Sequence, residues 1–137
     1  MEEAIIFRDF EEYAIKLDSL LTKLRKQVGN FLKGRATFTD LKPNIVRLRH
    51  YNELMTKTLS SAEGEEISSE YRDLFLTLVE FVMTVSLGEE RDILETLRKA
   101  LEKKGGDKER KLVAEALNEM NILEKSVKKI YNSLGKL

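Results

Sequence analysis

The stretch LFLTLVEFVMTVSL, residues 74–87, decides the fold. Its polar residues do not alternate, as they would in a half-buried strand. With the preceding aspartate, most of them recur at steps of four, three and four, at Asp73, Thr77, Glu80 and Thr84, which places them on one stripe of a helix. The apolar arc of that helix then covers roughly two thirds of its surface. A helix of this kind must be packed on three sides, so we expect it to be the central helix of an all-α bundle.

The length and composition of the chain restrict the kind of protein that it can be. The chain has 137 residues, of which 35% are charged and 42% hydrophobic, with no cysteine, one histidine and one proline. This length and balance predict one helical domain over residues 1–137. The lack of cysteine excludes disulfides and thiolate chemistry. Heavy use of lysine and glutamate also suggests a thermophilic source.

The sequence contains no segment with the character of a membrane span or a leader. The longest apolar run falls short of the roughly 18–20 residues that a bilayer requires, and it includes Glu80. The chain starts with Met1-Glu2-Glu3, which does not resemble a secretory signal. We therefore expect a cytoplasmic protein without a membrane partner.

Apolar residues spaced by threes and fours predict two long helices before the central one. The first covers residues 3–33 and ends at Gly34, which can adopt the left-handed conformation. The second is capped by Thr39 or Asp40, has Pro43 in its first turn and breaks near residues 60–64. The predicted core positions of the first helix are Ile6, Phe10, Tyr13, Leu17, Leu20, Leu24, Val28 and Phe31. Those of the second helix are Leu41, Ile45, Leu48, Met55 and Leu59, with Tyr51 or Asn52 between Leu48 and Met55.

Two helices are predicted after the central one, which we expect to end at Gly88. Acidic residues from Glu89 to Asp92 suit the positive end of a short fourth helix, and Gly105-Gly106 stop it. Because the joints are short, successive helices should be antiparallel neighbours, which gives an antiparallel helical bundle of four long helices plus one short helix. The fifth helix is capped by Asp107, with core positions Val113, Ala116, Met120, Leu123, Val127, Ile130 and Leu134.

No pattern of catalytic, cofactor-binding or metal-binding residues stands out. His50 could be a phosphoacceptor on a helix, but the residues that follow it lack a phosphotransfer motif, and a surface histidine is the simpler interpretation. A bundle di-iron site needs Glu-x-x-His pairs, and Arg47 occupies the position of that glutamate. Adjacent acids such as Glu65-Glu66 and Glu89-Glu90 stand at predicted helix starts, where the helix dipole explains them. We expect a protein that is not an enzyme and that needs no cofactor.

The wide apolar arc of the central helix has two edges, one on each side of the polar stripe, which we call its shoulders. If the other helices cover one shoulder, the second forms a groove for a partner helix. We take Leu76, Met83 and Leu87 as the predicted partner-binding residues, because methionine packs adaptably. The alternative is that the first and fifth helices cover both shoulders. The second shoulder consists of Leu74, Phe81 and Val85.

Charge is uneven along the chain although its formal net value is zero. Residues 21–60 are mainly basic and residues 61–99 mainly acidic, so the simplest interpretation is that oppositely charged helices lie side by side. The alternative is a basic patch, at Arg35, Lys42, Arg47 and Arg49, for a partner or a nucleic acid. No helix-turn-helix, RRM or KH signature supports nucleic-acid binding.

The segment from Phe31 to Glu102 resembles the flagellar export chaperone FliS family. The resemblance rests on Phe31-Leu32-Lys33-Gly34 at a helix end, an amphipathic helix, the turn Glu63-Gly64-Glu65-Glu66-Ile67, the aromatic and aliphatic helix Tyr71–Leu87, and a charged joint before Ile93-Leu94-Glu95-Thr96-Leu97-Arg98. It implies a cytoplasmic, cofactor-free helical chaperone. Such proteins hold the helical end of flagellin and keep it from polymerising before export.

Three functions are therefore expected in decreasing order. The first is a non-enzymatic binding module, in its most concrete form a FliS-like chaperone that holds an amphipathic helix of a secreted partner. The second is a structural subunit that homodimerises through the first and fifth helices. The third is a nucleic-acid-binding accessory protein that uses the basic region 21–57.

Overall fold

The computed structural model describes residues 2–63 and 66–135, and within these ranges the chain forms helices and the connections between them. The predicted all-α class is confirmed. None of the described helices combines the length and the hydropathy that crossing a membrane would require. The elements are α1 Glu2–Leu32, α2 Phe38–Glu63, α3 Ser69–Phe81, the π-helical turn η1 Val82–Ser86, α4 Leu87–Lys104 and α5 Asp107–Gly135.

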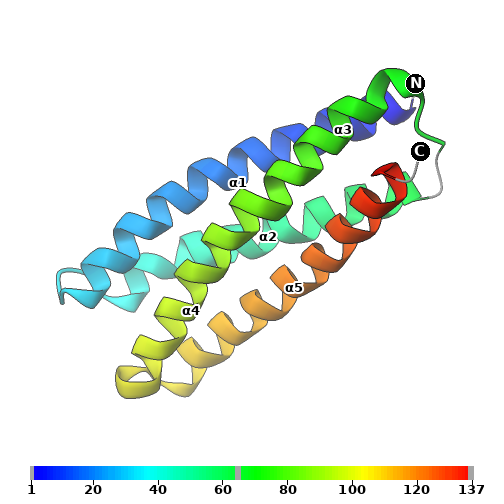
Figure 1. Ribbon diagram of the computed structural model, residues 1–137. Coiled ribbons are helices and arrows are strands. Elements are labelled where there is room, and N and C mark those ends of the chain that lie inside the picture. The colour runs from blue at the N-terminus through cyan, green and yellow to red at the C-terminus, as the bar shows by residue number, and fades with distance from the viewer. Residues whose placement is uncertain (1, 64–65, 136–137) are drawn as a thin grey trace.

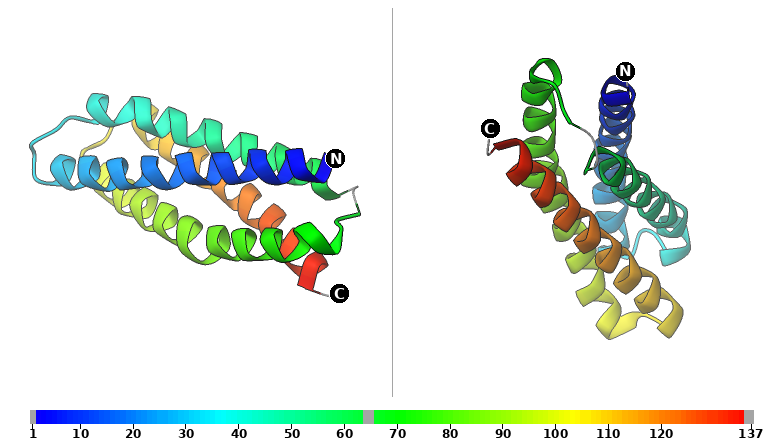
Figure 2. Two further views of the ribbon diagram at one scale, coloured as in Figure 1. Left: turned by 90° about the horizontal axis from the view of Figure 1, so that it is seen from above. Right: turned by 90° about the vertical axis from the view of Figure 1, so that its right-hand side faces the viewer.

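The long helices lie side by side and successive ones alternate in direction (Figure 1). α1 packs on α2, α2 on α5, and α5 on α4, while α3 and α4 close the arrangement against α1. α2 and α4 occupy diagonal positions, because the backbone of each lies beside α1 and α5 and, among the described residues, not beside that of the other. The α1–α2 and α4–α5 connections lie at one end of the molecule, and both termini lie at the other (Figures 1 and 2).

The apolar seams form the core as predicted. In α5 every predicted core position is buried, and in α2 all five are fully buried, with Asn52 rather than Tyr51 continuing the buried row. In α1 the seam is buried except for Tyr13 and Phe31, which are partly exposed and pack against the core. Periodicity therefore predicted these three helices well, because each has one clearly apolar face.

The prediction that Gly88 ends a helix is wrong. α3, η1 and α4 form one continuous helical segment over residues 69–104, so Gly88 lies inside it and no separate short helix exists in this part of the described chain. A glycine in a helix costs about 1 kcal/mol relative to alanine, and the buried side chains that follow outweigh this cost. Those side chains are Ile93, Leu94, Leu97 and Leu101.

The turn η1 keeps one face of this long segment in the core. The Leu87 N–H donates to the Val82 carbonyl, five residues earlier, as in a π-helix. Buried positions run at steps of four, from Val82 through Ser86 and Glu90 to Leu94. In a regular α-helix each such step would rotate the side chain by about 40° away from the core. The wider turn absorbs this rotation.

The expectation that the helix of residues 71–87 is central and packed on three sides is also wrong. α3 buries Phe75 and Val79, whereas the predicted polar stripe and one apolar shoulder remain exposed. The reason is that each long helix in this arrangement has two adjacent neighbours, which for α3 are α1 and α5. Two neighbours cover less than the whole apolar arc.

The start of α2 differs from the expectation of a Thr39 or Asp40 cap. Thr37 precedes the helix, and its backbone N–H donates to the Asp40 carboxylate at 2.8 Å, the reciprocal half of a capping box. Pro43 consequently lies in the second turn rather than the first. Gly34 has a φ of 73° and ends α1 as predicted.

Candidate functional site

One shoulder of the α3–α4 segment is exposed. Leu74, Phe81 and Val85 are 52%, 42% and 45% exposed, and the partly buried Leu78 lies between the first two. These four residues recur at helical steps of four, three and four, so they form a single row, which we call the apolar stripe. The stripe extends over about three helical turns on α3 and η1.

The predicted partner-binding residues lie on the other shoulder, beneath α5. The Arg72 guanidinium donates to the Leu134 carbonyl of α5 at 3.1 Å, which orients this face of α3 toward α5. Leu76 and Met83 follow on the same face and are partly buried against the core. Leu87 is fully buried, and its side chain offers no surface to a partner. Packing thus covers one shoulder and leaves the apolar stripe uncovered.

Acidic side chains of α1 border the apolar stripe on one side. On α1, Phe7 contacts Phe75 with ring centroids 5.2 Å apart, and Arg25 pairs with Glu89 at 3.2 Å, so this face of α1 lies toward the α3–α4 segment. Four-residue and seven-residue steps place Glu11 and Asp18 on the same face between these two contacts, and both are exposed. On the far side of the stripe lie the exposed Thr77 and Thr84, and the exposed carboxyl groups of Asp73 and Glu80 lie beyond them on the same helix.

The predicted basic patch does not form one free surface. Arg49 donates to Glu119 at 2.7 Å and pairs with Glu115 at 3.0 Å, and these carboxylates of α5 raise its pKa. Arg35, Lys42 and Arg47 are exposed, and Arg47 contacts the side chain of Asn44. The partners of Arg49 belong to α5 and not to the acidic stretch 61–99, whereas Arg25 of the basic stretch pairs with Glu89 of the acidic stretch at 3.2 Å.

His50 does not belong to a metal-binding cluster. Its side chain is exposed on α2, with its ring centroid 6.2 Å from that of Tyr51. Among residues 2–63 and 66–135, no three histidine, cysteine or acidic side chains come together as metal ligands would.

A buried polar cluster was not predicted. Asn52 of α2, Ser86 of η1 and Glu90 of α4 are all 0% exposed, and the Asn52 amide donates to the Glu90 carboxyl group at 2.5 Å. Within the described structure, Asn52 Oδ1, Ser86 Oγ and Glu90 Oε1 have no hydrogen-bond partner. Buried polar atoms are usually paired, so this cluster is chemically distinct from the apolar core around it.

Burial raises the pKa of Glu90 to about 8, although the Asn52 hydrogen bond and the charge of Arg91 act in the opposite direction. At neutral pH the carboxyl group is therefore mostly protonated. A protonated carboxyl carries one O–H donor, and an amide carries one carbonyl acceptor. The unpaired oxygens of Glu90 and Asn52 thus match the second hydrogen bond of a cyclic acid–amide pair.

The sequence contained a signal for this cluster. Asn52 is in phase with the apolar seam of α2, and the steps of four after Val82 lead to Glu90. The acidic pattern instead predicts that Glu90 lies at the start of the fourth helix, because that helix is expected to begin near Glu89. The position of the buried carboxyl depends on η1, which cannot be recognised from apolar periodicity.

Comparison of the chain with protein-family models, with curated proteins and with solved structures gives no match.

Proposed function

We propose that this protein is a non-enzymatic, cytoplasmic binding module, an antiparallel helical bundle that holds an amphipathic helix of a protein partner. The observation that carries the proposal is the apolar stripe, in which three large apolar side chains are exposed in one row. Single exposed apolar residues are common, but a contiguous row on one helix face is typical of a docking groove.

The spacing of the stripe fits helix recognition. Partner helices are held by anchors at steps of three, four and seven residues, which is also the spacing of Leu74, Phe81 and Val85. Full burial of one such side chain contributes about 1.5–3 kcal/mol, offset in part by the loss of freedom on association. The acidic border at Glu11 and Asp18, with Asp73 and Glu80 further round α3, favours a partner helix that carries lysine or arginine beside its apolar row.

The most concrete form of this proposal is an export chaperone like FliS. The resemblance over residues 31–102 supports this form of the proposal. The all-helical fold and the uncovered apolar stripe also support it. In this form the partner is the helical end of a secreted protein such as flagellin. Binding along the stripe would keep that helix from assembling early.

The test compares two substitutions on α3. Phe81→Asp places a charge in the stripe, whereas Thr77→Asp adds the same charge to the exposed polar face of the same helix. Proteins captured from native lysate by the wild type are identified by mass spectrometry, and the affinity of the captured helix is then measured by calorimetry. We expect Phe81→Asp to lose the partner and Thr77→Asp to retain it, with unchanged far-UV circular dichroism for both. Equal capture by the two variants would refute docking on the stripe.

Homodimerisation through α1 and α5 remains the alternative. Its support consists of exposed apolar side chains on these helices, Ile5, Ile15 and Leu32 on α1 and Ile122 on α5. Sedimentation velocity at micromolar concentration separates the two functions. A dimer that Ile15→Asp dissociates and Phe81→Asp leaves intact would favour the structural subunit.

A further inference from the structure

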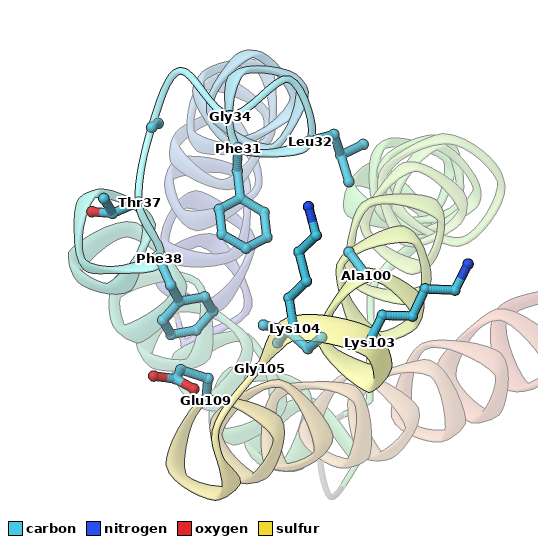
Figure 3. Close-up of a pocket in the computed structure, with 12 residues that line it drawn as sticks. Phe31, Leu32, Gly34, Thr37, Phe38, Ala100, Lys103, Lys104, Gly105 and Glu109 are labelled. Carbon is cyan, nitrogen blue, oxygen red and sulfur yellow. The ribbon is translucent and has the colours of Figure 1, made fainter.

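A cavity of about 500 Å³ opens at the end of the molecule where the α1–α2 and α4–α5 connections meet (Figure 3). Its volume lies within the usual range of small-molecule sites, roughly 300–1,000 Å³. The apolar part of its lining comes from three parts of the chain, the end of α1, the start of α2 with the connection before it, and the end of α4. These residues are Phe31, Leu32, Ala36, Phe38, Ala100 and Leu101.

Two aromatic rings form one wall of this cavity. Phe31 and Phe38 stand edge to face, with centroids 6.3 Å apart and planes at 72°. Gly34, with its positive φ, turns the chain between them. Figure 3 shows both rings directed toward the space between the two connections. The wall is therefore held by the backbone turn as well as by packing, which is the kind of preformed apolar surface that small ligands use.

Two lysines border the same cavity. Lys103 and Lys104 are exposed in the last turn of α4 and line the cavity together with the apolar residues. Their neighbours Arg98 and Arg110 pair with Glu102 and Asp107, whereas neither lysine joins an ion pair with any described residue. In Figure 3 the Lys104 side chain extends along the space beside Phe31.

Glu109 is the one carboxylate among the lining residues, and within the described structure it forms no ion pair with either lysine. Glu109 accepts a hydrogen bond from the backbone N–H of Gly106 at the start of α5. The carbonyl groups of Leu101 and Gly105 accept hydrogen bonds from Arg110 at 3.3 and 2.7 Å. The polar groups of this connection are thus paired with one another. The Lys104 ammonium group remains for an anion, whereas the Lys103 side chain extends away from the two rings (Figure 3).

We propose that this cavity binds a small anionic amphiphile, a free medium-chain carboxylate. The apolar chain lies against Phe31, Phe38 and Ala100, and the carboxylate lies at the mouth beside Lys104, with Lys103 adding positive charge to the same end of α4. Apolar burial supplies most of the affinity, and the lysines select the negatively charged head group. This site is separate from the apolar stripe, so its ligand is independent of the proposed protein partner.

The test is titration calorimetry with decanoate below its micellar concentration, with decanol and decyltrimethylammonium as neutral and cationic probes of the same chain length. We expect saturable one-to-one binding of decanoate, weaker binding of decanol and no binding of the cation. Salt should weaken decanoate binding, because the lysines are exposed. Equal binding of decanoate and decanol, or binding only to anionic phospholipid vesicles, would overturn the proposal.

Two kinds of variant test the site itself. Lys103→Gln with Lys104→Gln should weaken decanoate binding about three- to tenfold, in keeping with exposed ion pairs. The matched control is Lys99→Gln with Lys125→Gln, which removes the same charge from exposed lysines that do not line the cavity. Ala100→Phe should fill the cavity and abolish binding, and circular dichroism checks its fold. If the first double variant and its control bind decanoate equally, the lysines do not hold the ligand and the proposal fails.

Discussion

Asn52 of α2 and Glu90 of α4 are joined by a hydrogen bond across the core, although the backbones of these two helices are not neighbours in the described structure. Each reaches the other from a diagonal position through surroundings of leucine, valine and methionine. Because these groups are buried away from bulk water, the protonation state of Glu90 is coupled to folding.

Stability should fall as the pH rises. The pKa of Glu90 is raised from its ordinary value of 4.5 to about 8 in the folded protein, so the folded state holds a proton that the unfolded state releases. The resulting stabilisation is complete below about pH 4.5 and is lost as the pH rises through 8. We expect the free energy of unfolding in urea to drop by on the order of 3–4 kcal/mol between about pH 5 and 8.5.

Glu90→Gln should remove this pH dependence, because glutamine keeps a neutral hydrogen-bonding group of similar shape. The control is Glu89→Gln, which changes the adjacent, partly exposed carboxylate and should retain the slope. Both are followed by urea unfolding at several pH values above about 5.5, where ordinary carboxylates are already ionised. A flat wild-type profile would show that Glu90 is not buried as described.

Replacing the pair should be better tolerated than breaking it. Asn52→Leu alone leaves a buried carboxyl group without its donor and should cost about 1–3 kcal/mol. Glu90→Met alone leaves the amide unpaired at a similar cost. In the double variant no polar group of the pair remains, so its stability should exceed that of either single variant. A double-mutant cycle by urea unfolding measures the coupling, and strictly additive losses would contradict it.

Two glycines should respond to alanine in opposite directions. Gly88 lies within the long helical segment, and no atom lies within 4 Å of an added Cβ, so Gly88→Ala should stabilise the protein by about 0.5–1 kcal/mol. Gly34 has a φ of 73°, so Gly34→Ala should destabilise it by about 1 kcal/mol. Thermal unfolding compares the two. If Gly88→Ala instead destabilised the protein, the result would favour a helix that ends at Gly88, as the sequence predicted.

The Arg49 pairs should contribute to stability more than the neighbouring arginine does. The Arg49 side chain is 28% exposed and binds Glu119 through two nitrogens, at 2.7 and 3.0 Å. Arg49→Ala should cost about 1 kcal/mol, and Arg49→Lys should not restore it, because lysine cannot reproduce the two-point contact. Arg47→Ala, which removes a contact of 3.5 Å to Asn44, is the control and should have little effect. Equal losses at the two positions, measured by urea unfolding, would argue against the Arg49–Glu119 contact.

The sequence predicted α1, α2 and α5 well because each has one apolar face of ordinary width. It failed where an element departs from the regular helix. Regular helical periodicity does not reveal the π-helical turn at Val82–Ser86, so it predicts a helix end at Gly88 and a helix-start position for Glu90. Helical periodicity also identified both shoulders of residues 74–87 but not which of them α5 covers. That choice depends on three-dimensional packing, which leaves Leu74, Phe81 and Val85 exposed and Leu87 buried.

The turn η1 fixes the rotational phase of everything that follows it on the same helix. Removing one residue from Val82–Ser86 would turn α4 by about 100° relative to α3, and Glu90 would leave its partner on α2. Adding one residue would have a similar effect in the other sense. Proteins that share this arrangement should therefore vary in length at the connections between helices, and should keep a constant number of residues between Phe75 and Leu94.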